Sequence, residues 1–155
     1  MQLEIDQSGK IEQTNKNTIL CLTNDKSYCL VIPARIKRQL QKIFRFNNQA
    51  RNFILFTFSA GLAILIRQSS PGTKVLIDEE YIGKSPIIKN IIFQMLEDLE
   101  PTPTIAFKSI GKSSPAHLLA KEVALKRKKA DKTVSFKEII REIKKTEVGK
   151  RLKNA

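Results

Sequence analysis

The 155-residue sequence has no tryptophan, two tyrosines, one histidine and two cysteines. It has no uninterrupted apolar run of about 18 residues, which a membrane-spanning helix needs. Its longest apolar segment, residues 53–66, is interrupted by Thr57, Ser59 and Gly61. The N-terminus lacks the basic start of a signal peptide. We therefore expect a protein without a membrane span, long enough to bury one core.

The two cysteines are too few for a disulfide scaffold, and their spacing is not that of a metal site. Cys21 and Cys29 each lie in an apolar run typical of a strand. Free thiols of this kind are usually buried and inert. We expect two buried thiols in a reducing, cytoplasmic environment.

Acidic residues are scarce in the last third of the chain. The net charge is +13. Residues 1–107 carry 13 basic and 10 acidic residues, a net +3, while residues 108–155 carry 15 basic and 5 acidic residues, a net +10. A basic end on a nearly neutral body indicates a polyanionic partner, most often DNA or RNA. A lysine-rich, solvated helix is the alternative.

One stretch combines a strand, three acids and a helix start. Val75, Leu76 and Ile77 form a short apolar run that predicts a buried strand, and Asp78, Glu79 and Glu80 follow it directly. Ser85 and Pro86 are typical of a helix start. The acids then lie at the carboxyl end of a strand, where α/β proteins tend to bind ligands. A solvated acidic loop is the other interpretation.

The remaining pattern predicts an α/β fold with a mixed sheet. An antiparallel meander of about three strands is followed by units of strand and helix, with flanking helices and a basic C-terminal helix. The segment 53–66 is ambiguous, and its Phe, Ile and Thr content favours strands with a tight bend. We expect strands at 3–6, 18–23, 27–32, 75–78 and 104–110, and helices at 34–44, 86–99, 115–129 and 136–145.

A short motif occurs twice, each time between a predicted strand and a predicted helix. It reads Ile-Gly-Lys-Ser at residues 82–85 and again at residues 110–113. A phosphate-binding P-loop would need a glycine five residues before each Gly-Lys pair. Asp78 and Ala106 occupy those positions, so the P-loop interpretation fails. A helix N-terminus with a nearby lysine can still attract a phosphate, and plain helix capping is the alternative.

Three residues are candidates for a metal site. Asp6 ends the first strand and Asp78 ends a later one, so pairing of these strands would bring the two carboxylates together. Hard cations such as Mg²⁺ bind a few carboxylate oxygens and keep positions open for phosphate. His117, the only histidine, lies in the first turn of the helix after Pro115 and would complete the site. Glu122 lies more than a turn further along and is a weaker candidate.

These residues also carry a resemblance to a known group of proteins. Ile5-Asp6-Gln7-Ser8-Gly9 is similar to the first-strand aspartate motif of the ribonuclease H-like superfamily, which includes ribonucleases H, RuvC-type resolvases and Piwi domains. Leu76-Ile77-Asp78 resembles its central-strand aspartate. Residues 114–121, with His117, are similar to the last-helix motif of Piwi domains. The likeness covers roughly residues 1–129.

The resemblance implies a nuclease that depends on Mg²⁺ or Mn²⁺ and cuts phosphodiester bonds in DNA or RNA. Asp6, Asp78 and His117 would hold the metal, and Glu79 or Glu80 would assist catalysis. One departure is that residues 34–46 contain no acid, although many ribonucleases H carry a glutamate on this helix. The domain would span residues 1–130, followed by a basic helical extension at 131–155.

Basic residues near the predicted site and on the last helices would hold the phosphate backbone without reading sequence. Few aromatic residues lie among them, so stacking on unpaired bases is not indicated. The predicted nucleic-acid-binding residues are Lys84, Lys112, Lys121, Lys126, Arg127, Lys128 and Lys129.

Two other functions remain open. The chain is a nucleic-acid-binding subunit without catalysis if the acids form a solvated loop, or an assembly protein if the basic C-terminal helix docks on an acidic partner. A resolvase-like enzyme would work as a homodimer, but no heptad is visible. We expect the residues after Thr146 to be disordered alone and to become ordered on a partner. Convergence of Asp6, Asp78 and His117 separates the enzyme from these alternatives.

Overall fold

The structure is a computed structural model that describes residues 2–24 and 26–155. Asp25, in the predicted turn between the second and third strands, lies outside the described residues. The strands are β1 (Gln2–Ser8), β2 (Thr18–Thr23), β3 (Ser27–Ile32), β4 (Lys74–Asp78), β5 (Thr104–Lys108) and β6 (Lys132–Thr133). The helices are α1 (Ala34–Phe46), η1 (Ala50–Asn52), α2 (Phe53–Ile66), α3 (Ser85–Met95), α4 (Pro115–Ala124), α5 (Phe136–Ile143) and α6 (Glu147–Lys150).

A mixed six-stranded sheet organises the molecule, in the order β5-β4-β1-β2-β3-β6. The first three strands form the antiparallel meander that the sequence predicts. β4 then pairs in parallel with β1, and β5 with β4. Because β1 and β4 are parallel neighbours, Asp6 and Asp78 lie toward the same edge of the sheet. The α/β class and the mixed sheet with flanking helices are therefore confirmed.

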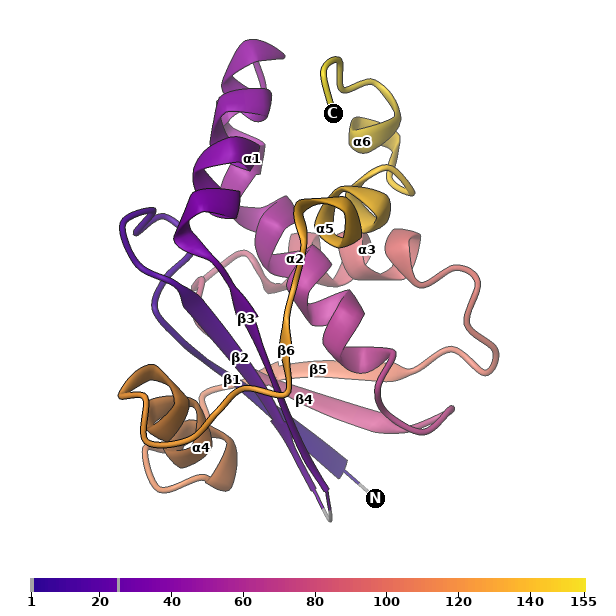
Figure 1. The fold of residues 1–155 in the computed structure, drawn as a ribbon. Coiled ribbons are helices and arrows are strands. Elements are labelled where there is room, and N and C mark those ends of the chain that lie inside the picture. Colours follow the sequence, from indigo (N-terminus) through magenta and orange to yellow (C-terminus); the bar gives the residue numbers. More distant parts are fainter. Residues whose placement is uncertain (1, 25) are drawn as a thin grey trace.

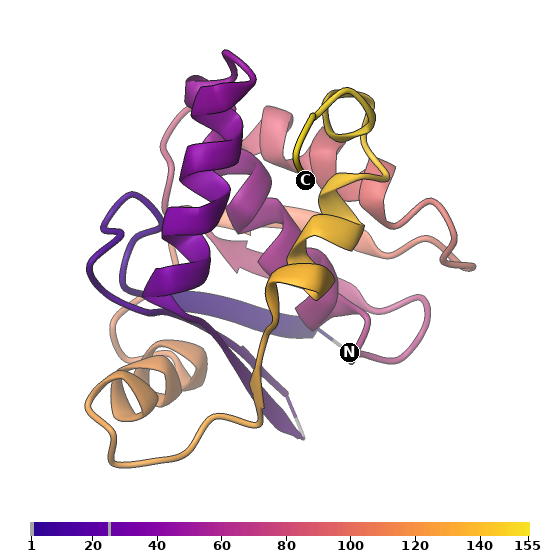
Figure 2. The same ribbon diagram turned by 45° about the horizontal axis from the view of Figure 1, so that its top comes forward.

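The helices are divided unequally between the two faces of the sheet. Figures 1 and 2 show α4 alone on one side, while α1, α2, α3 and α5 gather on the other. The larger core lies between the sheet and that second group of helices, and it includes Ile5, Leu30 and Ile77 from the strands. A smaller cluster, including Ile19 and Val123, lies under α4.

The prediction of strands at residues 53–66 is wrong, because this segment forms the helix α2. Nearly every residue of α2 is buried, since the sheet, α3 and α5 all pack against it. A helix buried on all sides has no polar face, and the usual periodic signal of a helix is therefore missing. Gly61 allows the close approach to the sheet, because an added Cβ would lie 2.7 Å from Leu20 Cδ1.

The chain after residue 130 joins the same sheet and core as the preceding residues. β6 pairs in parallel with β3, and Ile139 and Ile143 of α5 are fully buried in the larger core. The residues after Thr146, expected to order only on a partner, form α6 and a tail that packs on the protein. This C-terminal segment, which the sequence predicts as an extension, belongs to the folded body.

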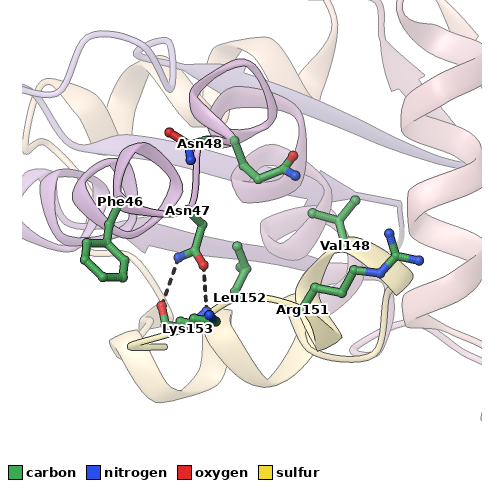
Figure 3. A pocket seen from close by; sticks show the side chains of 8 residues that line it. Phe46, Asn47, Asn48, Val148, Arg151, Leu152 and Lys153 are labelled. Atoms are coloured by element: carbon green, nitrogen blue, oxygen red, sulfur yellow. Dashed lines mark hydrogen bonds between the residues drawn. The ribbon is translucent and has the colours of Figure 1, made fainter.

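A side-chain clasp holds the tail against the end of α1. The Asn47 amide donates to the Lys153 carbonyl at 2.9 Å, and the Lys153 backbone N–H donates to Asn47 Oδ1 at 2.8 Å. Figure 3 shows both bonds at the rim of a hollow of about 390 Å³, between Phe46 on one side and Arg151 on the other. The hollow contains none of the candidate metal ligands.

The expectation of two free thiols is wrong as well. Cys21 and Cys29 form a disulfide with a Cα–Cα distance of 4.2 Å. They are directly opposite in the pairing of β2 with β3, so their side chains extend from the same face of the sheet. Both are buried under α4.

Helix α4 ends earlier than the sequence predicts. It stops at Ala124 instead of near residue 129, because Lys126 adopts a left-handed backbone conformation with φ of 60°. The run of four basic residues at 126–129 therefore lies in the connection to β6 rather than on a helix. None of the helices in the described part of the chain is long and apolar enough to span a membrane.

Candidate metal centre

Asp6 is the most buried acid of the candidate site. It lies near the carboxyl end of β1, on the face that α4 covers, and its side chain is 3% exposed. The backbone N–H of Gln7 donates to Asp6 Oδ1 at 2.7 Å, and His117 Nδ1 lies 2.9 Å from Oδ2. Each oxygen of the carboxylate therefore has one partner, which fixes its orientation.

Asp78 and Glu80 join Asp6 at the same edge. Asp78 ends β4, and its Oδ1 accepts a hydrogen bond of 2.7 Å from the Ile110 N–H, which follows β5. Glu80 is carried by the loop after β4. One carboxylate oxygen from each of Asp6, Asp78 and Glu80 lies within 4.8 Å of the others. The three acids that converge come from two neighbouring strands and the loop between β4 and α3.

Burial, together with the nearby acidic charges, raises the pKa of two of these acids, Asp6 and Glu80. Burial raises the pKa of Asp6 most, and the nearby Asp78 charge raises it further against the lowering effect of Gln7 and His117. Burial also raises the pKa of Glu80, with contributions from the charges of Asp78 and Asp6, while Lys10 acts in the opposite direction. A bound divalent cation would relieve this repulsion.

The donor atoms fit a hard cation. All three groups that converge are carboxylates, which suit Mg²⁺ or Mn²⁺, while zinc sites usually include histidine or cysteine. Asp6, Asp78 and Glu80 could therefore hold such an ion.

His117 contacts the site through Asp6. Ser114 caps α4 by accepting from the His117 N–H at 3.1 Å, and this cap places the histidine in the first turn. With an ionised carboxylate as its partner, Nδ1 carries the proton and Nε2 is the remaining nitrogen. The structure thus brings His117 to Asp6, but the cluster of three converging ligands in the described chain does not include it.

The two adjacent glutamates of the loop differ in position. The Glu79 N–H donates to the Lys108 carbonyl, and its side chain accepts from Ser85 Oγ at 3.5 Å, so Glu79 stays outside the cluster. Glu80 is followed by Tyr81, whose ring packs edge-to-face on Phe58 with centroids 5.0 Å apart.

Tyr81 fastens the acidic loop to the loop after β1. Its hydroxyl accepts from the Ile11 N–H at 3.1 Å and donates to Glu12 Oε1 at 3.2 Å. Burial raises the pKa of Tyr81, so the hydroxyl keeps its proton. The anchored ring positions the neighbouring Glu80, a role that the sequence does not reveal because it depends on contacts with residues about seventy positions away.

The predicted basic residues fall into separate groups. Lys84 and Lys112 are exposed in the loops that lead into α3 and α4. Lys121 lies exposed on α4, and Arg127 is within 3.5 Å of Glu122, the weaker metal candidate, which the cluster does not include. The remaining three, Lys126, Lys128 and Lys129, line a broad groove together with Lys16.

Lys16 and Lys10 are the basic residues that sequence reasoning missed. The charge of Lys10 opposes the rise in the pKa of Glu80, and Lys16 lines the same groove as the basic connection after α4. The polar composition of residues 12–17 marks a loop, but only the tertiary structure shows what this loop faces.

Comparison with known proteins gives no relative for this chain. No protein-family model matches it, and neither a curated protein nor a solved structure matches it significantly.

Proposed function

We propose that this protein is a metal-dependent nuclease with a ribonuclease H-like fold, which cleaves phosphodiester bonds in DNA or RNA. The observation that carries the proposal is the convergence of Asp6, Asp78 and Glu80 at one edge of the sheet. The sheet order, with the two aspartates on the adjacent parallel strands β1 and β4, supports the proposed fold.

Each acid has a defined part in this proposal. Asp6 and Asp78 would hold Mg²⁺ or Mn²⁺, and Glu80 would add a third carboxylate from its loop. The bound ion would polarise the scissile phosphate and lower the pKa of an attacking water. The hydrogen bonds from Gln7 and Ile110 fix the two aspartates before any ion arrives, which reduces the cost of organising the site.

His117 would act beside the metal rather than among its first ligands. Its Nδ1 holds Asp6 in place, and its Nε2 would be the nitrogen that acts as a general acid or base. A histidine partner on a metal-binding carboxylate is a common way to fix ligand orientation. Replacement of His117 by Asn should therefore weaken cutting less than loss of either aspartate.

The test is cleavage of labelled single-stranded, duplex, hybrid and branched substrates with Mg²⁺, Mn²⁺ or EDTA. A bound ion stabilises the transition state by several kcal/mol, and Asp6→Asn/Asp78→Asn should lose that ion. The double variant should therefore lower the cleavage rate on the order of a thousandfold. Glu80→Gln should also lose activity, while Glu79→Gln, which alters the adjacent acid outside the cluster, should retain it.

Metal binding can be measured independently of cutting. Mg²⁺ or Mn²⁺ should raise the melting temperature of the wild-type protein and leave that of the double variant unchanged, because an ion that binds only the folded state stabilises it. Metal-independent cutting, or equal activity of the double variant, would refute the proposal. Salt-sensitive binding without cutting would support the non-catalytic nucleic-acid-binding subunit instead.

A further inference from the structure

A broad groove of about 1130 Å³ opens on the face of the sheet that carries α4. It lies between the loop after β1, the strands β2 and β3, and the connection from α4 to β6. Ser8, at its near end, is two residues beyond Asp6 on β1, and alternate residues of a strand face the same side. The groove and the acids therefore share one face of the sheet, the face that carries α4.

The charged side chains that line the groove all have the same sign. They are Lys16, Lys126, Lys128 and Lys129, and no carboxylate lies among the described lining residues. None of these four ammonium groups makes a hydrogen bond or ion pair within the described chain, unlike the neighbouring Arg127. Four unpaired cations around one concave surface form an electrostatic site for a polyanion.

Lys126 occupies a backbone position that favours glycine. After α4 the Arg127 N–H donates to the Glu122 carbonyl and the Lys126 N–H donates to the Val123 carbonyl, the pattern of a Schellman helix end. Lys126 itself has a positive φ of 60°, a backbone conformation that is strained for any residue with a Cβ. The chain thus carries a charged residue where a glycine would fold more easily.

We propose that this groove binds the phosphodiester backbone of a duplex nucleic acid and leads it toward the candidate metal centre. The inference rests on the proposed function, and it adds the class of substrate and the path of that substrate across the protein. Gln13, Asn15 and Asn17, on the same loop as Lys16, add polar groups to the lining. Amides and ammonium groups are typical phosphate contacts that carry no sequence information.

The lining of the groove favours a duplex over a single strand. Proteins that bind single strands stack aromatic side chains on the unpaired bases. The described residues that line the groove include no aromatic side chain. A duplex keeps its bases stacked on one another and presents its phosphate backbone on the outside, where lysines and amides can contact it.

The experiment measures binding in EDTA, so that it does not depend on metal or cutting. Fluorescence anisotropy with labelled DNA, RNA and hybrid duplexes and the matching single strands gives affinities between about 50 and 200 mM salt. The groove variant is Lys126→Gln/Lys128→Gln/Lys129→Gln. The matched control is Lys42→Gln/Lys89→Gln/Lys137→Gln, which removes the same charge from exposed lysines of α1, α3 and α5.

Duplex should bind more tightly than single strand. The groove variant should lower the slope of log affinity against log salt by about one for each lysine lost, while the control variant keeps a slope near wild type. Equal slopes for the two variants would overturn the groove as the binding site. Preference for single strands would overturn the assignment of a duplex.

Lys126→Gly separates loss of binding from loss of folding. Because glycine accepts the left-handed conformation, this variant should melt at the same temperature as wild type or higher, yet bind the duplex more weakly. Weaker binding together with a lower melting temperature would contradict the inference. If the groove binds duplex but the protein cuts no substrate, the proposed nuclease function is refuted and the groove assignment stands. If the protein cuts nucleic acid and the groove variant binds as tightly as wild type, the groove assignment is refuted and the nuclease function stands.

Discussion

The face of the sheet under α1, α2, α3 and α5 is packed by large side chains, whereas the face under α4 is packed by a few smaller ones. Phe44, Phe58 and Leu62 are almost completely buried in the first core. The second consists mainly of Ile19, Val123 and the Cys21–Cys29 pair. Every candidate metal ligand, and the lysine-lined groove, lies on or beside the thinly covered face.

This difference indicates a division between the two faces: one stabilises the fold and the other carries the candidate functional groups. Most of the buried apolar residues lie on one side of the sheet, which therefore supplies most of the hydrophobic stabilisation. The other side can then hold repelling carboxylates and unpaired lysines, which both oppose folding. Functional sites are commonly strained in this way, and the strain is tolerated because the rest of the structure over-determines the fold.

The largest expected effect on the free energy of unfolding comes from truncating a core side chain on the heavily packed face. Leu62→Ala should lower the free energy of unfolding by about 2–5 kcal/mol, since a fully buried leucine leaves a cavity. Val123→Ala, under α4, should lower it by only about 1–2 kcal/mol, because less apolar surface is lost. Urea unfolding followed by circular dichroism measures both.

The exposed Leu118→Ala on α4 is the control for the same chemical change and should have little effect. If Val123→Ala proved as costly as Leu62→Ala, the two faces would contribute equally and the proposed division would be wrong.

The next effect concerns the cross-link on the thinly covered face. Cys21→Ala/Cys29→Ala should lower stability by about 2–3 kcal/mol, because the disulfide restricts the unfolded chain across the hairpin. A reducing agent should destabilise the wild-type protein by a similar amount and leave the double variant unchanged. Equal stability of the oxidised and reduced wild-type protein would contradict this prediction.

The smallest expected effect on the free energy of unfolding comes from removing a surface ion pair on the heavily packed face. Arg67 at the end of α2 donates to Asp98 at 2.8 Å, and this contact lowers the pKa of Asp98 to about 2. A carboxylate with a lowered pKa stabilises the fold above its ordinary pKa and loses that contribution as the pH falls through its folded value. The contribution should therefore be complete above about pH 4 and vanish near pH 2.

Asp98→Asn should cost less than about 1 kcal/mol at pH 7, because Asp98 is largely exposed and solvent screens the pair. The wild-type and variant unfolding free energies should meet near pH 2. A difference that stayed constant between pH 7 and pH 2 would show that the carboxylate charge is not responsible.

The sequence predicts the meander and the acidic edge well, for physical reasons. The strands at 18–23 and 27–32 have the bounds that the sequence predicts, because β-branched and apolar residues end at turn residues on both sides. Asp6 and Asp78 meet because β1 and β4 pair in parallel with Ile5 opposite Ile77, although β1 continues past Asp6 to Ser8. His117 reaches Asp6 because Ser114 and Pro115 fix the start of α4.

Other features depend on contacts that the sequence pattern does not contain. The helix α2 lacks a polar face, so its composition resembles that of a strand. The choice of Glu80 over Glu79 follows from the anchoring of Tyr81 on Phe58 and Ile11. The disulfide follows from the register of β2 on β3, which places Cys21 opposite Cys29.

The position of α2 has a consequence for biosynthesis. This helix is the most apolar segment of the chain, and α5, one of the elements that cover it, is made only after β4, α3, β5 and α4. A growing chain therefore carries an uncovered apolar helix for much of its synthesis, a state that is prone to aggregate and that chaperones bind. Slowing translation between residues 66 and 136 should lengthen that interval and increase the dependence of the nascent chain on chaperones.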